Sequence, residues 1–133
     1  MKRILAPIVL ALTFSVMFSS ISFAGWKKVG SSVTGTTYYV DFERIRKHGG
    51  YVYYWQLTDK FKPDEVGDLS DKTYSQGDCN LFRHKWLDIS YHTQPMGEGR
   101  PSLTGVTKGQ KWRYPHPNTV IEEVLKSVCA YAK

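Results

Sequence analysis

The chain has 133 residues, and its 18 Lys and Arg residues against 12 Asp and Glu residues give a formal net charge of +6. This length suits one domain with a single core and excludes a pair of independent domains. The charge surplus favours acidic partners such as glycans, anionic lipid or acidic protein surfaces, although soluble proteins also carry such a surplus for solubility alone.

The first 24 residues have the pattern of a secretory signal peptide. Two cations near the start precede an uncharged apolar run, residues 4–23. The segment ends with Ser22 and Ala24, small residues at the two positions that a signal peptidase reads. An uncleaved membrane anchor is the alternative, because the run is just long enough to span a bilayer. Serines thin the run towards its end and favour cleavage before Gly25, and no cysteine follows the run that could carry a lipid.

Removal of 24 of the 133 residues leaves a domain of 109 residues, 25–133, with a net charge of +4, because Lys2 and Arg3 leave with the signal peptide. We therefore expect an exported protein of the periplasm or the cell surface. Both cysteines, Cys79 and Cys129, lie in this domain and predict one disulfide in an oxidising compartment. A metal or redox pair is the alternative, but no C-x-x-C motif occurs and neither cysteine has a partner at ligand spacing.

Alternating aromatic and β-branched residues predict strands over most of the domain. The charged stretch 43–48 is predicted as a turn or a single helical turn. The stretch 61–77 has no sustained period and is predicted as a mobile connection. The strands that we expect are 26–29, 36–42, Tyr51–Asp59, 78–87, 88–93 and 102–107.

One helix is predicted near the C-terminus. Thr119 and Glu122 form an S/T-x-x-E capping box, and an apolar stripe follows at spacings of three and four. Cys129 lies in this stripe, so a disulfide to Cys79 would tie the helix to a strand that begins at Asp78. The predicted fold class is α+β: a small antiparallel β-sheet with a C-terminal α-helix packed on it and tied by one disulfide.

The domain contains no catalytic or phosphate-binding motif of the G-x-S-x-G, P-loop or G-x-G-x-x-G type. His84 and His92 could approach each other across paired strands, but two histidines alone make a poor metal site. The carboxylates of 61–77 are expected to be solvated, with calcium binding as the alternative, since the EF-hand pattern is absent. We therefore expect no enzymatic activity, no metal and no cofactor.

Two basic clusters are candidate binding sites: Arg44, Arg46 and Lys47 in one turn, and Arg83 and Lys85 in a predicted strand. Both could attract an anionic polymer; a solvated turn and a charge-protected sheet edge are the alternatives. The 9 Tyr and 4 Trp residues exceed the needs of one small core. They favour a partner or dimer interface, or a two-sided sheet with tyrosines on its outer face.

Short motifs spread over nearly all of the domain share a pattern with one known family. They are Trp26, Tyr38-Tyr39-Val40-Asp41 before the basic turn, Trp55, Asp78-Cys79 after a segment with Ser70 and Lys72, Tyr91, Met96-Gly97-Glu98-Gly99, Trp112, and the closing helix 119–129. Together they resemble the bacterial surface-adhesin protein E-like family. The resemblance implies an antiparallel sheet flanked by a helix, one structural intramolecular disulfide and no catalysis. It also implies binding to host extracellular-matrix and plasma proteins, and self-association.

The leading hypothesis is a non-enzymatic exported binding protein that adheres to host matrix or other macromolecules, such as acidic glycans, through an aromatic and basic surface. The alternative is a periplasmic binding or inhibitor protein of the cell envelope, because the leader offers no lipidation cysteine for surface display. Neither hypothesis requires nucleic acid, and both leave no membrane span after signal cleavage; a homodimer is compatible with each.

Overall fold

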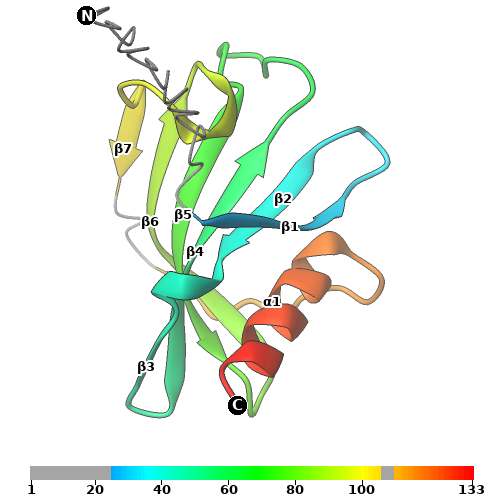
Figure 1. The fold of residues 1–133 in the computed structure, drawn as a ribbon, viewed down its shortest axis with the longest axis vertical. Coiled ribbons are helices and arrows are strands. Elements are labelled where there is room, and N and C mark those ends of the chain that lie inside the picture. Colours follow the sequence, from blue (N-terminus) through cyan, green and yellow to red (C-terminus); the bar gives the residue numbers. More distant parts are fainter. Residues whose placement is uncertain (1–24, 106–109) are drawn as a thin grey trace, which may run out of the picture.

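The computed structural model describes residues 25–105 and 110–133 (Figure 1). The predicted signal peptide and the end of the predicted strand 102–107 lie outside the described residues. The elements are β1 (Trp26–Ser31), β2 (Thr37–Asp41), the 3-10 helix η1 (Phe42–Arg44), β3 (Arg46–His48), β4 (Tyr51–Asp59), β5 (Ser70–Asp78), β6 (Arg83–His92), the 3-10 helix η2 (Pro95–Gly97), β7 (Leu103–Gly105) and α1 (Val120–Tyr131).

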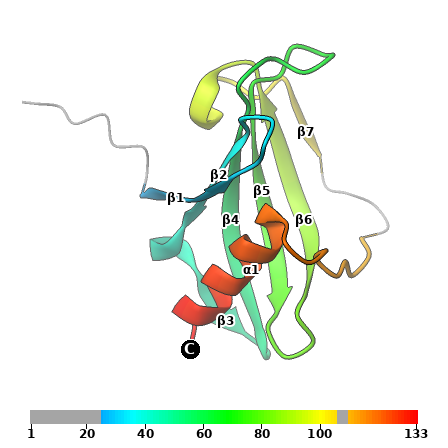
Figure 2. The same cartoon turned by 90° about the vertical axis from the view of Figure 1, so that its right-hand side faces the viewer.

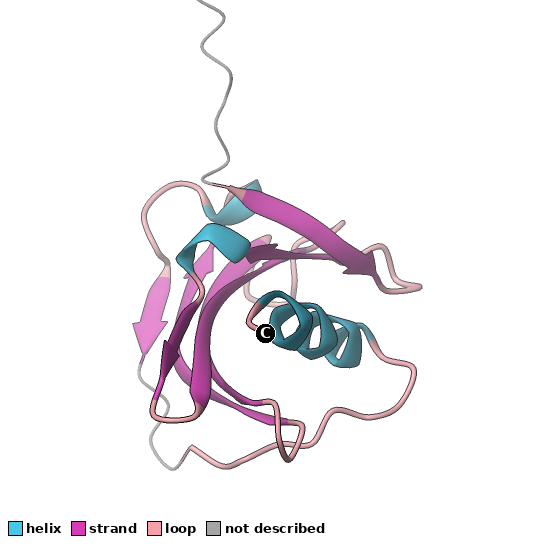
Figure 3. Ribbon diagram, turned by 60° about the horizontal axis from the view of Figure 1, so that its bottom comes forward, coloured by secondary structure: helices cyan, strands magenta, loops and turns pink. Residues whose placement is uncertain are grey.

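The strands form one antiparallel sheet in the order β1-β2-β4-β5-β6-β7, and β3 pairs with the start of β4. The sheet curves around α1, which lies on its concave side (Figures 1 and 3). Each strand therefore has an inner face towards the helix and an outer face away from it. This arrangement confirms the predicted α+β architecture.

The core lies between the inner face of the sheet and the apolar stripe of α1. Its buried side chains include Tyr54 and Val52 from β4, which pack with Leu125 and Val128 from the helix. Burial of each such aliphatic side chain contributes about 1.5–3 kcal/mol. The predicted helix is confirmed, and so is its cap: the side chain of Thr119 accepts a hydrogen bond from the backbone N–H of Glu122.

The predicted irregular connection 61–77 is wrong for its second half, because β5 occupies Ser70–Asp78 and pairs with β4 on one side and β6 on the other. The buried positions of β5 carry small or polar residues instead of large apolar ones. At Gly77, a Cβ atom would lie 2.8 Å from Val52 Cγ2 and 3.2 Å from Leu125 Cδ1. The helix and β4 therefore approach this strand too closely for a larger residue, and the usual alternation of apolar side chains is missing from its sequence.

The two strands predicted at 78–87 and 88–93 are one strand, β6, and residues 79–82 form the turn that precedes it. The register between β5 and β6 shifts between Tyr74 and Ser75, where Asp88 and Trp86 are their partners. Leu87 is therefore the extra residue of a β-bulge, at the point where the sequence suggested a break. The stretch 43–48 contains the end of the helical turn η1, as expected, followed by the short strand β3 instead of a turn alone.

Cys79 and Cys129 form the predicted disulfide, with a Cα–Cα distance of 5.7 Å and a sequence separation of 50. Cys79 lies in the turn directly after β5, so the bond ties the helix to the β5–β6 turn. In the chain-entropy model, closing a loop of this length stabilises the fold by about 4 kcal/mol. The C-terminal end of α1 lies beside the β3–β4 turn (Figure 2), where residues of both segments line one cavity.

Candidate functional site

The outer face of the sheet carries cations and half-buried aromatic rings. Because Val52 and Tyr54 point to the helix, the alternation of β4 places Tyr51, Tyr53 and Trp55 on the opposite side. Register then aligns residues of neighbouring strands with them. The outer face, as the term is used below, consists of Trp26, Arg44, Arg46, Tyr51, Tyr53, Trp55, Tyr74, Arg83, Lys85 and Trp112.

One half of the outer face is organised around Arg44. Its guanidinium carbon lies 5.9 Å from the ring centroid of Trp26 and 5.8 Å from that of Trp55, within the range of cation–π attraction. Trp55 continues the contact to Tyr74 at 4.9 Å, and Tyr74 contacts Tyr53 at 6.2 Å. Residues of β1, η1, β4 and β5 thus contribute to a continuous row of rings.

The other half is organised around Trp112, which no predicted element contained. The backbone of Arg113 exchanges two hydrogen bonds with that of His84, at 2.9 and 2.8 Å, so this segment adds to the edge of β6. Trp112 consequently lies on the outer face, 5.5 Å from Tyr51 and under two cations of β6. The Arg83 guanidinium carbon is 4.2 Å from its ring centroid, and the Lys85 Nζ atom is 4.4 Å from it.

Acidic neighbours neutralise two of the outer-face cations. Arg44 Nε lies 2.6 Å from an oxygen of Asp41, and Arg83 Nε lies 3.0 Å from an oxygen of Asp78. Arg46 and Lys85 form no ion pair within residues 25–105 and 110–133. The outer face is therefore more aromatic and less cationic than the basic clusters of the sequence suggested.

Lys47 is separated from the other four basic residues. It pairs with Val52 in the register of β3 and β4, which places it on the inner side of the sheet. There it lines an open cavity of about 570 Å³, together with the β3–β4 turn, both disulfide cysteines and the C-terminal Lys133. The structure thus brings together Arg44, Arg46, Arg83 and Lys85 and leaves Lys47 elsewhere.

Residues 26–130 match the family model of surface-adhesin protein E. The chain belongs to the surface-adhesin protein E family. This match covers every strand of the described part and nearly all of α1, so the family assignment applies to the domain that carries the outer face.

Solved structures of Haemophilus influenzae protein E have the same fold as this chain. The structure of crystal form II of protein E aligns with a TM-score of 0.61 and 19% identity, over 83% of this chain and 91% of that one. Two further structures of the same protein align with TM-scores of 0.56 and 0.54, at 17% and 16% identity, over 80% of this chain and 85% and 76% of theirs. No curated protein sequence matches the chain.

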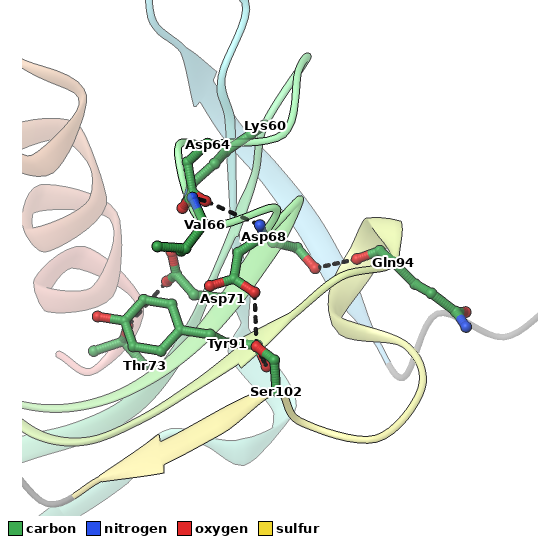
Figure 4. Close-up of polar contacts among 10 residues, drawn as sticks. Lys60, Asp64, Val66, Asp68, Asp71, Thr73, Tyr91, Gln94 and Ser102 are labelled. Carbon is green, nitrogen blue, oxygen red and sulfur yellow. Dashed lines mark hydrogen bonds and ion pairs between the residues drawn. The ribbon is translucent and has the colours of Figure 1, made fainter.

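The acidic segment of this adhesin-family domain is held by internal partners (Figure 4). The carboxylate of Asp64 accepts hydrogen bonds from Lys60 Nζ at 2.7 Å and from two backbone N–H groups. Asp68 accepts a hydrogen bond from Ser102 Oγ at 2.6 Å. Thr73 Oγ1 donates to Asp71, whose pKa is raised by burial. Among the residues that the structure describes, no group of three or more His, Cys, Asp or Glu side chains could hold a metal ion.

The two histidines considered as a metal pair do not meet across paired strands, because both lie on β6, near its opposite ends. His92 is buried under η2, where its ring nitrogens lie 2.9 Å from Ser90 Oγ and 3.2 Å from the Glu98 carbonyl oxygen. His84 is buried on the inner face, and burial together with the nearby Arg113 lowers its pKa below the ordinary value. Both histidines are therefore buried side chains that do not face each other across a strand pair.

Asp78 anchors the turn beneath the Trp112 half of the outer face. Burial disfavours its charged form, but the backbone N–H groups of Leu81 and Asn80 and the guanidinium of Arg83 donate hydrogen bonds to its carboxylate. These donors outweigh burial and hold the pKa of Asp78 below its usual range. The ionised carboxylate thereby fixes the position of Arg83 over Trp112 at neutral pH.

Charge clustering in the sequence identified the cations of the outer face but not its rings. Tyr74 lies in a stretch predicted to be irregular, and Trp112 lies in a stretch without a predicted element. The surplus of Tyr and Trp was a sound signal for such a face, yet only strand register could show which rings share it. Within the described part, no helix is both long and apolar enough to cross a membrane.

Proposed function

We propose that this domain is a non-enzymatic binding protein that adheres to a host matrix protein through its outer face. Membership in a family of surface adhesins supports macromolecular binding, and the two groups of rings and cations on one face are the observation that supports the site. Trp, Tyr and Arg are the residues that dominate binding energy at protein interfaces.

The composition of the outer face predicts the character of the interaction. Because Arg44 and Arg83 are paired with carboxylates, only Arg46 and Lys85 act as uncompensated cations of this face in the described part of the chain. Attraction between exposed charges is screened over about 8 Å at physiological salt. We therefore expect affinity to weaken only modestly as salt rises, while the contribution from burial of the rings against the partner persists.

The proposed function also includes export of the domain after removal of a signal peptide. We expect the signal peptide 1–24 to be removed before Gly25, so that the domain 25–133 folds and forms its disulfide in the periplasm or at the cell surface. The intact mass of the exported protein measures this directly. A species that retains residues 1–24 would contradict the processing.

Titration of the domain onto immobilised matrix proteins and acidic glycans, across a salt series and with or without chelator, tests the binding. Replacement of Tyr74 and Trp112 together by Ala should reduce affinity at least tenfold, as removal of two interface anchors does. Replacement of Arg46 and Lys85 by Ser should slow association and flatten the salt dependence.

The matched control is Lys47→Ser, which removes one positive charge next to Arg46 but on the other side of the sheet. It should leave binding unchanged. Arg44 is unsuitable as a probe, because its removal would leave the buried carboxylate of Asp41 without its ion-pair partner. Equal losses for Lys47→Ser and for the Arg46 and Lys85 variant would contradict the outer face as the site. Absence of binding to any matrix protein, with resistance to protease on intact cells, would favour a periplasmic envelope partner instead.

A further inference from the structure

Asp41, the last residue of β2, has a buried carboxylate oxygen without a partner. The residue is only 2% exposed. Its Oδ2 atom accepts a hydrogen bond from Arg44 Nε at 2.6 Å, whereas Oδ1 is buried and has no hydrogen-bond partner in the described part of the chain. Burial removes water from a carboxylate oxygen, and this costs free energy unless a new hydrogen-bond donor takes the place of the water. Buried carboxylate oxygens are therefore rarely left unpaired in native proteins.

The orphaned oxygen faces Gly25. A Cβ atom built on Gly25 would lie 3.2 Å from Asp41 Oδ1 and 3.4 Å from Glu43 Oε2. The backbone nitrogen of Gly25 is bonded to the same Cα atom, so it lies no more than about 6 Å from either carboxylate oxygen. Glu43 is exposed and forms no ion pair within residues 25–105 and 110–133. Two carboxylates, one of them buried, thus converge on one backbone position.

The sequence independently identifies Gly25 as the residue that follows the predicted cleavage site. Hydrolysis of the Ala24–Gly25 peptide bond consumes one water, leaves a carboxylate on Ala24 and frees an amine on Gly25. At neutral pH most of this amine is protonated. A neutral amide with one N–H donor is thereby replaced by an ammonium group with a positive charge and three donors.

We propose that Asp41 and Glu43 form a binding site for the α-ammonium group of Gly25, which occupies it after the signal peptide has been removed. The α-ammonium supplies the missing partner of Asp41 Oδ1. It also balances the local charge, since Asp41 and Glu43 carry two negative charges and Arg44 carries one positive charge. This inference rests on the proposed processing before Gly25.

The site connects processing to the outer face. The carboxylate of Asp41 bridges the α-ammonium on one oxygen and Arg44 on the other, and Arg44 lies over the rings of Trp26 and Trp55. Trp26 is also the strand partner of Asp41 in the pairing of β1 and β2. Cleavage thus completes the ion network that holds β1, Arg44 and this half of the outer face in place.

The test compares chains that begin at Gly25, released from a cleavable fusion and oxidised, with chains that retain Phe23 and Ala24. Both versions are made with the native Asp41 and with the substitution Asp41→Asn. The two extra residues should lower the melting temperature by several degrees, roughly 5 °C, in the native background. They should have little effect in the Asp41→Asn background, because the partner charge is already gone. Equal effects in both backgrounds, or none in either, would overturn the proposal.

Acylation of the α-amine at pH 7 tests the site without any substitution, should Asp41→Asn fail to fold. An ion-paired amine reacts slowly with an amine-directed ester, so Gly25 should react about tenfold more slowly in the folded domain than in the free peptide Gly-Trp-Lys-Lys. Equal rates would overturn the proposal. These measurements use a chain whose first residue is set to Gly25, so they remain informative if the mass of the exported protein shows cleavage elsewhere.

Discussion

The two faces of the sheet are built from the same strands but differ in what covers them. On β4, Val52 and Tyr54 are buried against α1, whereas Tyr53 and Trp55, between and beside them, remain half-buried on the outer face. The inner face uses small residues such as Gly77 where the helix approaches closely. The outer face uses large rings, and its two organising cations are each held by a buried carboxylate.

On the proposed function, this difference separates the residues that stabilise the fold from those that bind the partner. Substitutions on the inner face should change the free energy of unfolding and leave the binding surface intact in the molecules that fold. Substitutions on the outer face should weaken binding and have little effect on the free energy of unfolding. The predictions below test this separation, from the largest expected effect on stability to the smallest.

Loss of the disulfide should have the largest effect. Cys129→Ala should lower the free energy of unfolding by about 2–5 kcal/mol, because the 50-residue loop is no longer closed in the unfolded chain. Urea denaturation monitored by tryptophan fluorescence measures this. Lys126→Ala, an exposed position on the same helix, is the control and should change stability by less than about 0.5 kcal/mol. Free thiols in the unreduced wild-type protein would contradict the bond itself.

Truncation of a side chain in the apolar stripe of α1 should have the next largest effect on stability. Leu125 is fully buried against β4 and β5, so Leu125→Ala should cost about 3 kcal/mol through lost burial and the cavity left behind. The control is the same change at Leu103, which is 63% exposed and should be nearly neutral. Comparable losses at both positions would show that α1 is not the cover of the inner face.

A fall in pH should lower the stability of the folded domain through His84, which lies on the inner face. Because the folded state lowers the pKa of His84, the unfolded chain binds this proton more readily. Stability should therefore be full above the unfolded pKa of about 6.5 and decrease as the pH falls below it. Unfolding curves between pH 7.5 and 5 measure the slope, which His84→Leu should reduce. A stability that rises between pH 6.5 and 5.5 would contradict the assignment.

Protonation of Asp78 should cause a second loss of stability at lower pH. Its folded pKa lies below the unfolded value, so its contribution is present above about pH 4 and disappears as the pH falls through the folded pKa. In Asp78→Asn the low-pH part of the stability profile should flatten while the His84 part remains. Loss of both parts in this variant would mean that the two groups titrate as one unit.

Removal of a single outer-face ring should affect stability least. Tyr74→Ala should cost roughly 1 kcal/mol, because the ring loses its contacts with Trp55 and Tyr53 but is not part of the core. The neighbouring change Tyr54→Ala, on the inner face, should cost about 3–5 kcal/mol. Under conditions in which both variants remain folded, only Tyr74→Ala should weaken adhesion. The opposite ranking would place recognition on the inner face.

Elements with a strong local signal could be predicted from the sequence. The strand Tyr51–Asp59 has the same bounds in the structure, since strand-favouring aromatic and β-branched residues fill most of it and neither Gly nor Pro interrupts it. The helix begins at its predicted cap, because the Thr119 and Glu122 pair acts within one turn. The two cysteines could be paired because the domain contains no alternative partner.

Elements that depend on distant neighbours could not be predicted in this way. Strand β5 has polar and small side chains, and it is a central strand only because β4 and β6 supply its hydrogen bonds on both sides. Strand β6 looked like two strands because its bulge at Leu87 interrupts the alternation. Both errors follow from reading periodicity without knowing the partner strands.

The sequence by itself determined which side chains were available for recognition: basic residues in two clusters, a surplus of rings, and a pattern that resembles the adhesin family. Only the tertiary structure decided which of them lie on the same face. It placed Arg46 on the outer face and Lys47 on the inner side, although they are adjacent in the chain, because successive residues of a strand point to opposite faces of a sheet. It also brought Trp112 beside Tyr51, because pairing across strand edges joins residues that the chain keeps far apart.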